Sequence, residues 1–169
     1  MNAIERARGL TSVLQLNDEV LMAALTDMTD DQARRRLREA GPSVAWNIGH
    51  MLQHRHQIGA AIGCDGPGFD LTRYAKSATD GADYPTIREF RSAWRDYSAR
   101  LLSAVHQCGA AALDGPAPMR VPHAEQTLLE ALRFVVWHEG LHLGQISMLR
   151  SHHGLTPTVA LLTTQPVVA

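Results

Sequence analysis

The sequence predicts an all-α fold, a four-helix bundle formed by a single domain over residues 1–169. Alanine and leucine are the commonest residues, whereas aromatic residues make up only 5% of the chain, which favours helices over sheets. The length suits one hydrophobic core. Apolar residues recur at the three-and-four spacing of amphipathic helices in four stretches, which are separated by breaks rich in glycine and proline.

The first two helices are predicted from periodicity and from a helix cap. Residues 4–28 carry apolar side chains at helical spacing, and they predict the first helix. The charged segment 30–41 ends at a Gly-Pro break. Ser43 follows this break and is a typical N-cap residue, so a second helix is expected from there to about Gly63.

The third helix follows a connection over residues 64–83, which is rich in glycine and which we expect to cross the top of the bundle. Thr86 and Glu89 have the spacing of a capping box, in which each side chain bonds the other residue's backbone N–H. They predict a helix that runs to Cys108.

The fourth helix follows a connector that contains three prolines. A second capping box, Thr127 and Glu130, opens it, and Gly154 ends it after His153. The apolar tail, residues 159–169, is expected to dock either on its own bundle or on a second subunit.

Charge and cysteine content narrow the function classes. The net charge is −1, which gives no indication of a nucleic-acid partner or an anionic membrane surface. Cys64 and Cys108 cannot form a disulfide framework, so we expect a reducing, cytoplasmic location. The N-terminus has no apolar leader pattern, and no run approaches the roughly 18 apolar residues that span a bilayer.

Two pairs of histidines lie four residues apart, His50 with His54 and His138 with His142. At about 100° per residue, both pairs fall on the apolar side of their predicted helices. Buried imidazoles need polar partners, and a divalent metal ion satisfies several at once. We therefore predict His50, His138 and His142 as metal ligands. His54 is either a hydrogen-bonding neighbour of the ligands or a replacement for His50.

The other histidines are expected to lie away from this site. His152 and His153 are roughly 15 Å along the helix from His142, and they suit the last helical turn. His106 and His123 lie in or beside connectors and are expected at the surface.

Residues 138–142 also spell the metalloprotease pattern His-Glu-x-x-His, in which Glu139 would be the general base. No acidic residue follows Glu139, and no third histidine stands where the extended pattern needs it. Proteolysis is therefore disfavoured. Trp46, one turn before His50, either walls the site or belongs to the core.

The segments SVAWNIGHM (residues 43–51) and HEGLHLGQI (residues 138–146) together resemble the DinB-like superfamily. This group includes damage-inducible DinB proteins, bacillithiol and mycothiol S-transferases, and the mycothiol-dependent maleylpyruvate isomerase. The resemblance implies an up-down-down-up four-helix bundle, often dimeric. It also implies a divalent ion such as zinc, nickel or iron, held by His50, His138 and His142.

The resemblance implies transfer of the sulfur of a low-molecular-weight thiol, such as mycothiol or bacillithiol, to a small electrophile. Glu139 and Gln145 are candidate catalytic residues, which would handle protons or orient the ligands. Two alternatives stay open. One is a metal-dependent hydrolase of small molecules with Glu139 as base, and the other is a metal-binding stress-response protein without catalysis.

Overall fold

The structure is a computed structural model that describes residues 2–38, 41–68, 70–75, 83–122 and 124–163. These residues form seven α-helices and one short 3-10 helix, without an extended strand, so the all-α prediction is confirmed. The elements are α1 (Ala3–Ala24), α2 (Asp30–Arg34), α3 (Val44–Ala61), η1 (Thr72–Ala75), α4 (Ile87–Gln107), α5 (Ala110–Leu113), α6 (Leu128–His152) and α7 (Thr158–Thr163).

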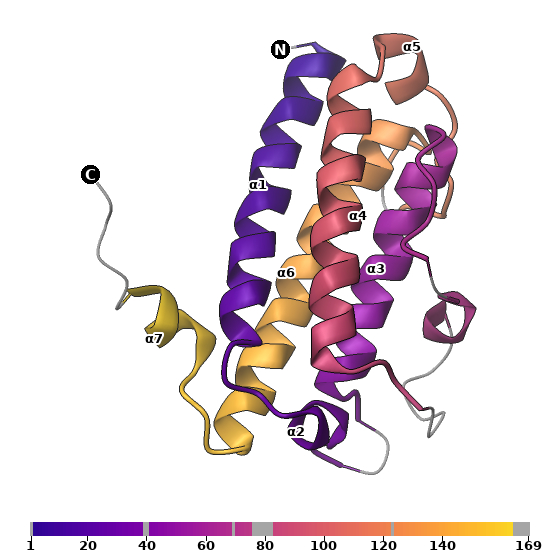
Figure 1. Cartoon of the computed structure of the whole chain (residues 1–169). Coiled ribbons are helices and arrows are strands. Elements are labelled where there is room, and N and C mark those ends of the chain that lie inside the picture. Colours follow the sequence, from indigo (N-terminus) through magenta and orange to yellow (C-terminus); the bar gives the residue numbers. More distant parts are fainter. Residues whose placement is uncertain (1, 39–40, 69, 76–82, 123, 164–169) are drawn as a thin grey trace.

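Four long helices, α1, α3, α4 and α6, lie side by side and enclose the core (Figure 1). Helices α1 and α3 each pack against both α4 and α6. Residue numbers rise together along α1 and α6, since Arg6 pairs with Glu130 and Asn17 bonds Glu139. These two helices therefore run in one direction, and α3 and α4 run in the other (Figure 1).

The predicted helix caps are present. Ser43, Thr86 and Thr127 each accept a hydrogen bond from the backbone N–H three residues further on. The capping box is reciprocal at Thr86 and Glu89. At Thr127 only the first of the two bonds forms, because the Glu130 carboxylate pairs with Arg6 and Arg133 instead.

The first helix is shorter than predicted, and a further helix follows it. Helix α1 ends at Ala24 instead of residue 28. The charged segment after it begins with α2, which has its own reciprocal capping box between Thr29 and Gln32. This box is visible in the sequence, and it could have predicted α2.

The long connection before α4 lies along α3, which corrects the expectation that it crosses the top of the bundle. A side chain at Gly66 would meet His56, and one at Gly49, two turns earlier in α3, would meet Tyr74. The connection therefore descends along α3. It has to do so because α3 and α4 point the same way, and the chain must return along the bundle between them (Figure 1).

The end of α6 is anchored to α1 by a buried arginine. Arg150 is fully buried, donates hydrogen bonds to the carbonyl oxygens of Ala24 and Thr156, and pairs with Asp27 at 2.8 Å. Gly154, at φ +75°, ends the helix as predicted.

Helix α7 then packs against α1 and α6, so this part of the tail docks on its own bundle. The rest of the predicted tail, residues 164–169, lies outside the described residues. None of the helices in the described ranges combines the length and apolar character needed to cross a bilayer.

Candidate metal centre

Three histidines from two antiparallel helices meet between α3 and α6. His50 comes from α3, and His138 and His142 come from adjacent turns of α6. One ring nitrogen of each lies within 4.8 Å of the others, so the three could hold a metal ion. His142 is buried, whereas His50 and His138 are half-buried, which leaves one side of the cluster accessible. The structure thus brings together the three predicted ligands.

The hydrogen bonds of two of the rings leave the opposite nitrogen free for a metal ion. The Nδ1 of His142 lies 2.6 Å from the Asn47 side-chain oxygen and 3.0 Å from that of Gln145. The Nδ1 of His50 lies 2.7 Å from the Tyr74 carbonyl oxygen. Since these oxygens only accept hydrogen bonds, each Nδ1 carries the proton and each Nε2 has a free lone pair. Metal-binding histidines are oriented in this way.

The ring of His138 faces the free Nε2 of His142. The Nε2 atoms of His138 and His142 are 3.0 Å apart, a separation that suits two neighbouring ligands bonded to one ion at about 2.0–2.1 Å. The Nδ1 of His138 is buried without a hydrogen-bond partner among the described residues. The donor set is therefore nitrogen-rich, of the kind that zinc, nickel and iron accept.

A glycine allows the connection to reach His50. A Cβ atom at Gly49 would lie 2.2 Å from the Tyr74 ring, so any other residue would displace this tyrosine. Tyr74 belongs to η1, and it is buried. Neither Tyr74 nor Asn47 was predicted as part of the site. The glycine directly before His50 is the sequence feature that could have indicated a close backbone approach.

Aromatic rings pack on the cluster from both helices. Trp46 stacks on His50 with ring centroids 4.4 Å apart, and Phe134 stacks on His138 at 5.4 Å. Trp46 is also a buried member of the core, so it both walls the site and belongs to the core. His54 lies beside the cluster, with its ring centroid 4.7 Å from that of His50 and 4.5 Å from that of His138. This position suits a neighbour of the ligands.

The three clustered histidines and the neighbouring His54 are neutral at neutral pH. Burial, helped by the nearby imidazoles, lowers the pKa of His138 to about 3 and those of His54 and His142 to about 4. Burial also lowers the pKa of His50. Neutral imidazole is the form that binds metal ions, because its lone pair is free.

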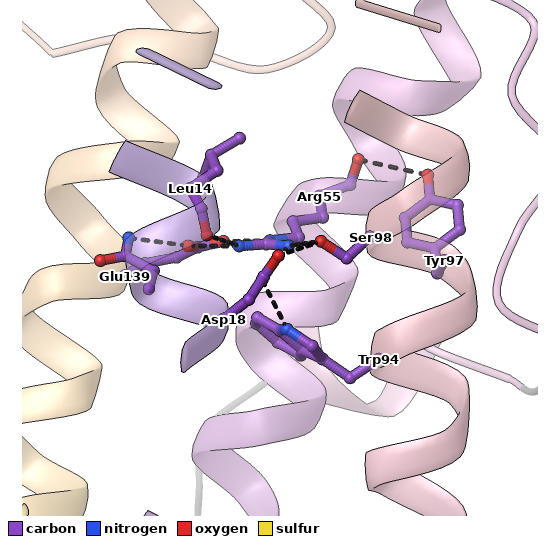
Figure 2. A network of polar contacts seen from close by, with 8 residues as sticks. Leu14, Asp18, Arg55, Trp94, Tyr97, Ser98 and Glu139 are labelled. Carbon is purple, nitrogen blue, oxygen red and sulfur yellow. Dashed lines mark hydrogen bonds and ion pairs between the residues drawn. The ribbon is translucent and has the colours of Figure 1, made fainter. Parts of the chain in front are cut away.

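Glu139 does not join the histidines, although it follows His138 directly. Its side chain is fully buried, and Arg55 contacts both carboxylate oxygens, at 2.5 and 2.9 Å. Asn17 adds a hydrogen bond of 3.0 Å. Arg55 also pairs with Asp18, which itself accepts hydrogen bonds from Trp94 and Ser98 (Figure 2).

His106, His152 and His153 are not part of the cluster. His152 is the last residue of α6 and His153 its C-cap, as predicted. His106 is exposed in the last turn of α4, where its Nε2 contacts the Thr11 hydroxyl at 2.8 Å. His123 lies outside the described residues.

Comparison with known proteins places the chain in a family. A family model of the DinB superfamily matches residues 14–146, which include all three clustered histidines. This span covers most of the chain, so the chain belongs to the DinB superfamily. No curated protein matches it.

We expect about one divalent ion per chain in the native protein, since three neutral imidazoles converge on one point. His50→Ala, His138→Ala and His142→Ala should each lose most of it. His153→Ala should keep it, because that ring lies outside the cluster. Elemental analysis of protein purified without a histidine tag measures the occupancy. Equal occupancy in all four variants would refute the site.

Gly49→Ala should weaken metal affinity about 10- to 100-fold, the usual effect of disturbing a group that orients a ligand. The new methyl group displaces Tyr74, and with it the carbonyl oxygen that holds His50. The matched control is Gly140→Ala, between the two α6 ligands, where an added Cβ meets nothing within 4 Å. Competition with a chromogenic chelator measures both affinities. A weakening in Gly140→Ala as large as that in Gly49→Ala would contradict this account.

The metal-free protein should lose stability as the pH falls from 6.5, the ordinary pKa of histidine, to about 3, the lowest pKa in the cluster. In this pH range the histidines of the unfolded chain bind protons, whereas the buried histidines of the folded chain stay neutral, so acid favours unfolding. Above this range the histidines are neutral in both the folded and the unfolded chain, and stability no longer depends on them. Urea midpoints with a chelator present test this. The double variant His138→Gln/His142→Gln should have a flatter pH profile, and an identical profile would show that other groups cause the loss.

Proposed function

We propose that this protein is a metal-dependent thiol S-transferase, which adds the sulfur of a low-molecular-weight thiol to a small electrophile. One observation carries the proposal: three neutral histidines converge within 4.8 Å at a half-exposed point in a chain of the DinB superfamily. The helix directions are in keeping with the resemblance on which the proposal draws, since the first and last long helices, α1 and α6, run one way and α3 and α4 run the other.

Each residue of the cluster has a defined task in this proposal. A bound divalent ion would favour the thiolate form of the thiol, which is the nucleophile. Three protein ligands would leave positions open for the thiol. Asn47 and Gln145 hold the His142 ring through its Nδ1 proton. Gln145 is therefore proposed to orient this ligand.

The overall reaction needs no further reagent. The S–H bond breaks and its proton passes to solvent, while a carbon–sulfur bond forms with the electrophile. A leaving group, where the electrophile has one, departs with its electron pair; otherwise the electron pair moves onto the electrophile, which then takes up a proton from solvent. We assign Glu139 to positioning rather than proton transfer, because Arg55 and Asn17 already engage both carboxylate oxygens.

The ion is proposed to be zinc, nickel or iron, and the thiol to be of the mycothiol or bacillithiol class. Such thiols require a reducing compartment, and we propose the cytoplasm. Cys64 and Cys108 are both free, in keeping with this setting. The homodimer stays a prediction.

The hydrolase alternative finds less support. It would need a carboxylate free to take a proton from water, and both oxygens of Glu139 are already occupied. No observation favours this function over thiol transfer.

The test follows the reaction of 1-chloro-2,4-dinitrobenzene with a panel of thiols by the absorbance of the thioether product. The metal-loaded protein should accelerate the reaction with at least one thiol, His142→Ala should abolish this, and His153→Ala should not. Formation of 2,4-dinitrophenol without any thiol would point to a hydrolase instead. Full metal occupancy with no acceleration for any thiol would leave a non-catalytic metal-binding protein.

A further inference from the structure

A pocket of about 470 Å³ lies on the first half of α6. None of the residues assigned to thiol transfer above lines this pocket. The connection before α6 forms its other wall. Its lining residues are Val121, Pro122, Glu130, Arg133, Phe134 and Trp137. This volume is typical of small-molecule sites, which fall in the range of about 300–1,000 Å³. We call it the α6 pocket.

The α6 pocket adjoins the histidine cluster through one shared ring. Phe134 lines the pocket, and it also stacks on His138, with ring centroids 5.4 Å apart and an angle of 25° between the ring planes. Trp137 continues this aromatic wall, 5.7 Å from Phe134. A molecule in the pocket would therefore lie beside a predicted metal ligand, with Phe134 between them.

The polar part of the pocket is the ion pair of Glu130 with Arg133, and Arg6, which is not a lining residue, shares the same carboxylate. The Glu130 carboxylate pairs with both Arg6, at 2.6 Å, and Arg133, at 3.0 Å. Two guanidinium groups thus share one carboxylate. Their side chains remain 41% and 59% exposed, and a guanidinium has five donors, so each can also bind a further anion.

We propose that the α6 pocket binds a small aromatic anion, with its ring against Phe134 and Trp137 and its carboxylate or sulfonate group at Arg133. Flat aromatic walls select a planar apolar body, and the exposed guanidinium of Arg133 selects the charge. Since the pocket adjoins the histidine cluster, this anion is the electrophile. That last step rests on the proposed function, whereas the binding itself does not.

Binding is measured with 8-anilinonaphthalene-1-sulfonate, an aromatic anion that fluoresces in apolar sites. The full-length protein should bind it at one saturable site. Trp137→Ala and Arg133→Gln should each raise the Kd about tenfold, equivalent to about 1.4 kcal/mol. Both side chains are well exposed, so neither change threatens the fold. The matched control is Leu141→Ala, an exposed apolar residue of the same helix outside the pocket, which should leave the Kd unchanged.

A neutral probe of the same shape, N-phenyl-1-naphthylamine, tests the charge. It should bind more weakly than the sulfonate and should not respond to Arg133→Gln. Equal binding of both probes, or an equal response of both to this variant, would overturn the assignment to an anion. A loss in Leu141→Ala as large as that in Trp137→Ala would also overturn it, because the probe would then be bound to the exposed face of α6 in general.

A further variant separates this inference from the proposed function. His142→Ala should lose the metal but keep probe binding, since it removes no lining residue of the pocket. If the native protein transfers thiols, the KM for 4-chloro-3,5-dinitrobenzoate should be lower than for its uncharged parent. Arg133→Gln should raise only the KM of the carboxylate. A common KM for both compounds would refute the anion as electrophile while leaving thiol transfer intact.

Discussion

All four long helices meet at the buried ion pair between Arg55 and Glu139. The arginine comes from α3 and the glutamate from α6, while Asp18 of α1 and Ser98 of α4 both contact the guanidinium (Figure 2). Both members of the pair are completely buried. Removing Arg55 would leave the Glu139 carboxylate as an uncompensated buried charge, which typically costs about 3–5 kcal/mol. The pair therefore fixes the rotation and the register of α3 against α6.

The histidine cluster depends on that register. Arg55 lies five residues after His50, and Glu139 lies between His138 and His142, so the ion pair and the clustered imidazoles occupy neighbouring turns of both helices. Neighbouring residues on a helix point about 100° apart. When Arg55 and Glu139 meet in the interior, the histidines before them are turned toward the half-exposed side. This geometry also explains why Glu139 cannot act as the general base of a metalloprotease, although the sequence matches the His-Glu-x-x-His pattern. The Glu139 carboxylate points into the bundle, away from the histidines.

Local patterns predicted most of the fold and the three histidines that cluster. Periodicity, caps and the four-residue histidine spacing are properties of single helices, and they indicated the long helices and the cluster of His50, His138 and His142. Arg55 was not predicted, because a charged residue between two histidines does not reveal a partner 84 residues away. The Tyr74 carbonyl is a backbone group that every residue carries, so only the path of the connection could place it.

The centre thus has a rigid side and an adaptable side. Helices hold the imidazoles, and a buried ionic network holds the helices, so the relative positions of the three rings tolerate little movement. By contrast, the proton on His50 depends on a carbonyl of η1, in a connection that packs along α3. Sequence changes in that connection can alter the orientation of one ligand without touching any histidine. Because α3 and α4 are parallel, the bundle cannot dispense with such a connection, and its topology itself supplies the group that orients His50.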